Sequence, residues 1–382
     1  MTAAPERQYY IDWLRLMAVF LLFFFHTACV FHPWSNFYIK NDISSPIITY
    51  IFVWAVGHWY MSLFFLLAGA STYYALQKRS SGEYTKERLK RLFIPLVFGT
   101  LILVPPISYL GLLNHSDYSQ SFLTWLPNFF HMQTADLDGY FLGGFTPGHL
   151  WFILHLLIYS LISLPLFLYF NRESGQKWIK RIVIILINPV VLFVLFPALL
   201  IPISKFPWIA GGNPLFYITF FIMGFILMSD KRFMDKIDSY RHILMFLGVV
   251  PLASFIFLDG MDYWPSTMPG WVESVTSEYR NAFVPWFFIL ALMAYARRFL
   301  NFSNRFLKYF AEGSYPIYIV HQTAIVVIAF FVVQWDLEAV SKYIIIVALA
   351  FWAVIFTYDI FIRRTNITRF LFGMKPLIKY KT

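Results

Sequence analysis

Charged side chains are scarce in this chain of 382 residues. Lysine, arginine, aspartate and glutamate make up 13% of it, whereas soluble domains carry about a quarter. Apolar residues account for 59% and aromatic residues for 21%. This balance excludes a soluble enzyme and a disordered chain. Cysteine is almost absent too, and the single Cys29 excludes a disulfide-stapled secreted domain.

Long charge-free apolar runs fill most of the sequence. A helix needs about 20 such residues to cross the hydrocarbon core of a membrane, and the runs do not alternate in polarity as barrel strands would. We therefore predict an all-α polytopic membrane protein with ten transmembrane helices. It forms one domain over residues 1–382 and ends in a basic cytoplasmic tail from about 362 to 382. The runs are 16–39, 43–77, 92–116, 139–171, 182–204, 206–229, 243–258, 281–296, 313–335 and 343–358.

An eleventh charge-free run, 118–135, is more polar than the others, since it holds serine, glutamine, proline and asparagine. These polar groups would be unpaired in lipid. We therefore expect this run to be an interfacial or re-entrant piece.

The basic residues give the chain a net charge of +10 and are placed unevenly between the runs. With a cytoplasmic N-terminus, 26 of the 30 lysines and arginines fall on the cytoplasmic side, as the positive-inside rule requires. Both termini are then cytoplasmic. This bias explains the basic charge without nucleic acid as a partner, and membrane lipids are the expected surroundings. The exceptions are Lys40, Lys205, Arg280 and Lys342.

The first run carries ionisable residues where lipid is expected, and such groups indicate function. Arg15 and His26 are eleven residues apart, so on a helix they are rotated by only about 20° and lie about 16 Å apart along the axis. Asp12 can pair with Arg15. The shared face predicts a lined cavity. The alternatives are that Arg15 reaches the inner interface and that a neighbouring helix satisfies His26.

Further histidines lie in other runs, at His58, His149, His155 and His321. Histidine suits proton transfer near neutral pH. One buried histidine is more often structural, but histidines in four spans favour a function. Metal binding is not predicted, because no His-Glu-x-x-His motif or acidic pair at helical spacing occurs.

The basic loop 78–91 holds Arg88 and Arg91. At i, i+3 on a helix they share a face, and two guanidinium groups so placed bind phosphates or amides. The alternative is topology signalling alone, which needs charge without fixed spacing. The basic segment after Arg363 is expected to lie on anionic lipid.

Two segments between runs, about 114–148 and 259–280, combine aromatic side chains with carboxylates, which suits a carbohydrate. The alternative is an ordinary interfacial aromatic belt. The carboxylates are Asp117, Asp136, Asp138, Asp259, Asp262, Glu273 and Glu278.

Several of these features together resemble the membrane acyltransferase-3 family. They are the opening Asp12-Trp-Leu-Arg15, the Arg15 to His26 spacing, Arg88-x-x-Arg91, Gly69 and the stretch 313–321. The segments 91–96, 104–106 and 148–152 are similar to a branch of that family associated with succinylating periplasmic glucans. The resemblance covers nearly the whole chain.

The resemblance implies an O-acyltransferase with ten core spans in a bacterial inner membrane. Its donor would be acyl-CoA from the cytoplasm, with no tightly bound cofactor. Its acceptor would be a hydroxyl of an extracytoplasmic glycan, and its acyl group acetyl or succinyl. Many sugar-acetylating members carry a glutamate shortly after the tryptophan matched by Trp151, where this chain has His155 and Leu156. That difference leaves acceptor and acyl group open.

The same resemblance assigns roles to residues. Arg15 and His26 match residues held to be essential, and we expect Arg15 to stabilise charge and His26 to act as general base or as transient acyl carrier. Arg88 and Arg91 match residues linked to donor handling. Cys29, one turn from His26, is an alternative acyl carrier or a small buried side chain. Tunnel-lining or acceptor-binding roles are expected for Asp12, His149, Trp151, Tyr315 and His321.

A competing hypothesis is a transporter or flippase for a lipid-linked or anionic solute. Prolines such as Pro105, Pro106 and Pro197 would break helices, and broken helices occur in transporters too. An inverted repeat would favour this class, and we find none in the sequence. A purely structural membrane scaffold is a third hypothesis, against which the Arg15 and His26 pattern argues.

Overall fold

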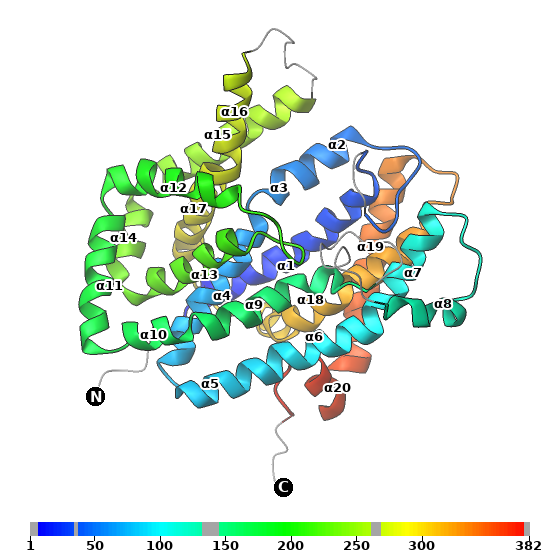
Figure 1. Ribbon diagram of the computed structural model, residues 1–382, viewed down its shortest axis with the longest axis horizontal. Coiled ribbons are helices and arrows are strands. Elements are labelled where there is room, and N and C mark those ends of the chain that lie inside the picture. Colours follow the sequence, from blue (N-terminus) through cyan, green and yellow to red (C-terminus); the bar gives the residue numbers. More distant parts are fainter. Residues whose placement is uncertain (1–6, 34–36, 132–144, 261–268, 378–382) are drawn as a thin grey trace.

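The computed structural model describes residues 7–33, 37–131, 145–260 and 269–377, and those residues form helices and loops with no strand (Figure 1). The first part of the chain forms α1 (Tyr9–Val30), α2 (Pro46–Ile48), η1 (Thr49–Trp54), α3 (Ala55–Gly57), α4 (Tyr60–Leu76), α5 (Ser81–Arg88), η2 (Leu89–Phe93), α6 (Ile94–Phe98), η3 (Gly99–Leu103), α7 (Val104–His115) and α8 (Phe122–Phe129). The middle forms η5 (Gly148–Leu150), α9 (Trp151–Ile162), α10 (Leu164–Phe170), α11 (Glu173–Leu186), η6 (Val191–Leu195), α12 (Phe196–Ser204), α13 (Pro214–Ser229) and α14 (Lys231–Ser239). The last part forms α15 (Arg241–Gly260), α16 (Gly270–Glu278), η7 (Tyr279–Phe283), α17 (Val284–Phe299), α18 (Arg305–Val332), α19 (Ala339–Thr357), η8 (Tyr358–Ile362) and α20 (Asn366–Leu371).

The predicted membrane helices are present. Within the described residues, seven helices are long and apolar enough to cross a membrane, and there are up to ten if each of three bent helix pairs counts as one span. The bent pairs are α9 with α10, α11–α12 and α13 with α14, with bends of 48°, 84° and 100°. The ten candidates coincide with the ten predicted runs, so the all-α polytopic class is confirmed. The polar run 118–135 forms only the eight-residue α8 within its described part.

Several helices begin before the apolar runs that predicted them. The first starts at Tyr9 rather than at residue 16, because Asp12 pairs with Arg15 and Arg7 and the charges are neutralised in place. The third starts at Ser81, where Ser80 and Glu83 form a capping box that satisfies free backbone N–H groups.

Proline shapes the spans in a regular way. Four π-helical segments end two residues before a proline, namely η2 before Pro95, η3 before Pro105, η6 before Pro197 and η7 before Pro285. Proline lacks an N–H and its ring clashes with the carbonyl four residues earlier. A wider turn just before the proline relieves that clash, and the helix continues.

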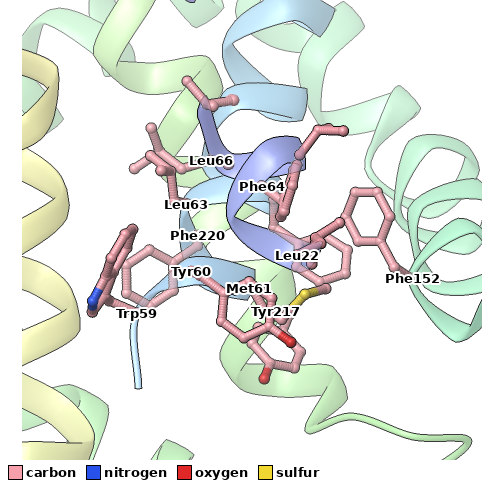
Figure 2. Packing of buried hydrophobic residues seen from close by; sticks show 14 of the residues in the cluster. Leu22, Trp59, Tyr60, Met61, Leu63, Phe64, Leu66, Phe152, Tyr217 and Phe220 are labelled. Atoms are coloured by element: carbon pink, nitrogen blue, oxygen red, sulfur yellow. The ribbon is translucent and has the colours of Figure 1, made fainter. Parts of the chain in front are cut away.

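The helices pack through aromatic side chains and close glycine contacts. A Cβ on Gly69 of α4 would lie 1.8 Å from the Phe221 oxygen, and one on Gly224 of α13 would lie 1.9 Å from the Leu66 oxygen. These two helices therefore touch backbone to backbone, as small residues allow in membranes. Figure 2 shows Leu22 of α1 packed among residues of α4, α9 and α13. This packing holds α1 among its neighbours and sets the positions of Arg15 and His26.

Candidate functional site

Arg15 makes its predicted partnership with Asp12 and a second one with α4. Its Nη1 lies 3.1 Å from Asp12 Oδ1, and its Nη2 donates to Ser71 Oγ at 2.7 Å. Asp12 also accepts from Arg7 at 2.8 Å. Arg15 is thus held against α4 by fixed partners, with its side chain partly exposed.

Arg88 binds Thr72 of α4, the residue next to the Ser71 that binds Arg15. Its Nη2 donates to Thr72 Oγ1 at 3.1 Å, and its guanidinium lies over the Tyr84 ring at 4.7 Å. The Tyr84 hydroxyl lies 3.2 Å from Thr72 Oγ1. Because Ser71 and Thr72 are adjacent, α1 and α5 bring two guanidinium groups to one turn of α4. The sequence did not lead us to Ser71 and Thr72. The feature that could have identified them is a pair of adjacent hydroxyl side chains within an apolar run.

Arg91 takes different partners from Arg88. Its Nη1 lies 3.2 Å from Glu87 Oε1, and its Nε donates to the Gly373 carbonyl at 3.1 Å. The helix widens into η2 between Arg88 and Arg91. The Tyr315 ring of α18 lies beside the same Gly373, and the Tyr315 hydroxyl is buried without a hydrogen-bond partner among the described residues. We call Arg15, Arg88 and Arg91 the arginine group.

Three histidines from three separate elements meet further along the bundle, and we call them the histidine group. The His321 ring on α18 lies 5.2 Å from the His26 ring on α1 and 5.2 Å from the His149 ring on η5. His149 and His321 are almost fully buried. The sequence predicted each histidine as a candidate, but not that the three would lie together.

Hydrogen bonds assign the proton on two of these rings. His149 Nε2 lies 2.8 Å from the Ile319 carbonyl, and His321 Nδ1 bonds the Tyr318 carbonyl. A carbonyl oxygen only accepts, so these nitrogens carry the protons and donate. The opposite nitrogens, His149 Nδ1 and His321 Nε2, are then lone-pair bases.

Helix α18 joins the two groups. It presents Tyr315, Tyr318 and His321 at three-residue intervals, and six residues advance a helix by about 9 Å. The Tyr318 hydroxyl donates to the His149 carbonyl, and His149 in turn donates to the Ile319 carbonyl of α18. Two hydrogen bonds therefore join η5 to α18. Sequence reasoning missed Tyr318, although it lies in the 313–321 stretch that carried the resemblance.

Both groups, and Tyr315 of α18, contain buried polar atoms without hydrogen-bond partners in the described part of the chain. Among the described residues, buried atoms without a hydrogen-bond partner include Arg88 Nε, Tyr315 Oη, His321 Nε2, His149 Nδ1 and His26 Nδ1. Buried polar groups are nearly always hydrogen-bonded, because an unpaired one is unfavourable. A bound substrate or water could supply the missing partners.

Other predicted residues lie apart from the histidine group. Trp151 packs against Tyr217 and His155, and His155 Nδ1 donates to the Trp151 carbonyl at 3.0 Å. His58 lies beside Trp54, near the charge of Arg280.

The predicted carboxylates do not form one described site. Glu278 pairs with Lys205 at 2.7 Å, while Asp117 and Glu273 are exposed. Asp136, Asp138 and Asp262, and the side chain of Asp259, lie outside the described residues. No group of three His, Cys, Asp or Glu side chains in the described part of the chain is arranged to hold a metal ion.

A bundle of membrane helices that holds three clustered histidines and, apart from them, partly exposed arginines fits one class of protein, the integral membrane enzymes that transfer a chemical group. The acyltransferase domain model of the acyltransferase-3 family matches residues 8–359. The chain therefore belongs to the acyltransferase-3 family and is a multi-pass membrane O-acyltransferase.

Three full-length relatives share one name. The chain is 21% identical over 400 residues to "Glucans biosynthesis protein C" of Salmonella paratyphi B and to the proteins of that name in Salmonella dublin and Salmonella enteritidis PT4. Each alignment covers 100% of this chain and 99% of the relative. No solved structure matches the chain.

Proposed function

We propose that the protein moves an acetyl or succinyl group from acyl-CoA to a hydroxyl of an extracytoplasmic glycan. The observation that carries the proposal is the histidine group, whose His321 shares α18 with Tyr315, six residues nearer the arginine group. A charged coenzyme cannot cross lipid, so the thioester has to meet its acceptor inside the bundle.

The arginine group suits the donor. Guanidinium groups bind phosphate through paired, charge-assisted hydrogen bonds. Arg88 keeps a buried Nε without a partner among the described residues. A surface hollow of about 540 Å³ lies on another face of the same helix, lined in part by Lys86 and Lys90 and not by Arg88 or Arg91. These cations would hold the phosphate end of acyl-CoA, and the pantetheine arm would pass Tyr315 toward the histidines.

The transfer step needs a base at the acceptor hydroxyl. As that oxygen attacks the thioester carbonyl, His26 takes its proton, the carbon–sulfur bond breaks, and the proton passes to the coenzyme thiolate. General-base catalysis of this kind contributes typically about 10²–10⁴-fold in rate. Arg15 would stabilise negative charge on the donor side.

His149 and His321 support His26 in this step. The His321 ring lies 5.2 Å from each of the other two rings, and its free Nε2 would relay the proton on its way from His26 to the coenzyme thiolate. A covalent acyl-His26 intermediate is the alternative route for the same residues.

The acceptor assignment rests on the relatives, which are named for glucan biosynthesis. His155, which with Leu156 lies where many sugar-acetylating members carry a glutamate, contacts Trp151 and Tyr159. Aromatic faces of this kind suit the C–H surface of a sugar. We further propose that the protein lies in a bacterial inner membrane with both termini in the cytoplasm.

The first prediction tests His26. Membranes carrying wild-type protein receive labelled acetyl-CoA or succinyl-CoA, and label is followed into glycan. We expect His26→Ala to reduce transfer at least about 100-fold, because the general base is lost. The matched control is His242→Ala, because His242 is an exposed histidine bonded to Tyr295. Equal labelling by wild type and His26→Ala, at equal expression, would remove His26 from the mechanism.

A further inference from the structure

Residues 363–374 follow the segment matched by the family model, which ends at residue 359. They include α20, which packs against α6 and lies below α6 in the view of Figure 1. Arg369 and Phe372 are buried, with 5% and 7% exposure. The expectation that this basic segment lies on lipid therefore does not hold for these two residues.

Arg369 anchors the segment. Its guanidinium donates to Glu312 of α18 at 2.6 Å, to the Lys375 carbonyl at 2.6 Å and to the Arg363 carbonyl at 3.1 Å. Three of its nitrogens are thus committed within the protein. A guanidinium buried in this way shapes its own chain and fixes that chain to α18.

Gly373 ends α20 in a left-handed turn. Its φ is +68°, Gly373 N–H donates to the Phe370 carbonyl, and Met374 N–H donates to the Arg369 carbonyl. This pair of bonds is the Schellman arrangement, which favours glycine at the left-handed position. The turn presents the Gly373 carbonyl to Arg91 Nε at 3.1 Å.

Gly373 also has no room for a side chain. A Cβ there would lie 2.6 Å from the Arg91 oxygen, 2.8 Å from the Tyr315 ring and 3.1 Å from Pro95. Phe372 packs against Phe98, with ring centres 5.3 Å apart. The turn is therefore wedged between η2, α6 and α18.

We propose that residues 363–374 form a cap that positions Arg91 for the acyl donor. The inference rests on the proposed donor role of the arginine group. Arg91 is held from two directions, by Glu87 of its own helix and by Gly373 of the cap. The cap contributes no group to the reaction itself and acts through Arg91.

The experiment compares Gly373→Ala, Arg369→Ala, Arg91→Ala and the double variant Arg91→Ala with Gly373→Ala in purified full-length protein. The control is Ile367→Ala, because Ile367 is 75% exposed on the same helix. KM for acyl-CoA and kcat are measured separately, together with direct binding of acetyl-CoA and succinyl-CoA and thermal unfolding.

We expect Gly373→Ala and Arg369→Ala to raise KM for the donor about tenfold, which is about 1.4 kcal/mol, with kcat changed less than about twofold. In the Arg91→Ala background, Gly373→Ala should cause almost no further rise in KM, because the effects of two substitutions that act through one contact are not additive. Should either variant fold poorly, Glu312→Gln keeps an acceptor for Arg369 and should raise KM by a smaller factor.

The outcomes separate the two proposals. If wild type binds acyl-CoA, Arg91→Ala weakens binding and both cap variants keep the wild-type KM, the cap inference is wrong and the donor role stands. Additive effects of Gly373→Ala and Arg91→Ala would also overturn it. If wild type binds no acyl-CoA, the donor role itself fails.

Discussion

At the scale of single residues, the chemistry depends on which nitrogen of each histidine is free. His321 donates from Nδ1 to the Tyr318 carbonyl, and His149 donates from Nε2 to the Ile319 carbonyl. Both acceptors are backbone atoms of α18, so the fold itself sets the tautomers. His26 Nδ1 is buried without a partner among the described residues. The three rings therefore present bases to one region.

His321→Asn tests this arrangement at one atom. The asparagine amide can still donate to the Tyr318 carbonyl, as Nδ1 does, but the Nε2 base is gone. We expect thermal stability to change little, while transfer falls about 100-fold, the lower end of the range for general-base catalysis. Acyl transfer and thermal unfolding of the same preparation provide the check. A variant of wild-type activity would show that His321 Nε2 takes no proton.

At the scale of elements, the contact between α4 and α13 depends on two glycines. Each would place a Cβ within 2 Å of a backbone oxygen of the other helix, at Phe221 for Gly69 and at Leu66 for Gly224. Backbone cannot yield as a flexible side chain does, so the helices would have to separate. Because α4 carries the partners of Arg15 and Arg88, the separation would reach the arginine group.

We expect Gly69→Ala to destabilise the protein by about 1–3 kcal/mol, the usual range for overpacking, and to weaken donor binding. Gly57→Ala is the matched control, because its Cβ would meet only Phe25 at 3.6 Å. Thermal unfolding in detergent measures the difference. Equal stability of the two variants would contradict the close contact described for α4 and α13.

At the scale of the whole molecule, the orientation in the membrane decides where donor and acceptor enter. The 26 basic residues predict that the α5 end lies in the cytoplasm. Cys29 is the single cysteine, so a cysteine-free background for accessibility labelling needs one substitution. Exposed positions at opposite ends are Lys86 on α5 and Ser119 beyond α7.

In that background, we expect an impermeant maleimide to label Ser119→Cys in intact cells. Lys86→Cys should react only after the membrane is opened. The reverse labelling pattern would show the opposite topology. The arginine group would then lie on the wrong side of the membrane for a cytoplasmic coenzyme.

Much of this protein could be predicted from its sequence alone. Apolar runs long enough to cross a membrane produce helices because lipid leaves the backbone no other partner, and all ten coincide with helical candidates. The Arg15 and Asp12 pair was predictable as well, because three residues along one helix decide it. The capping box at Ser80 and Glu83 is equally local.

Only the tertiary structure decided which of these residues meet. The histidine group joins α1, η5 and α18, which are separated by more than a hundred residues. Arg88 turns to α4 and Arg91 turns to Gly373, although their spacing on one helix predicted a shared face. The spacing of residues along the chain describes contacts within one helix. Contacts between helices depend on how glycine, proline and aromatic side chains let the spans pack, and that is a property of the whole bundle.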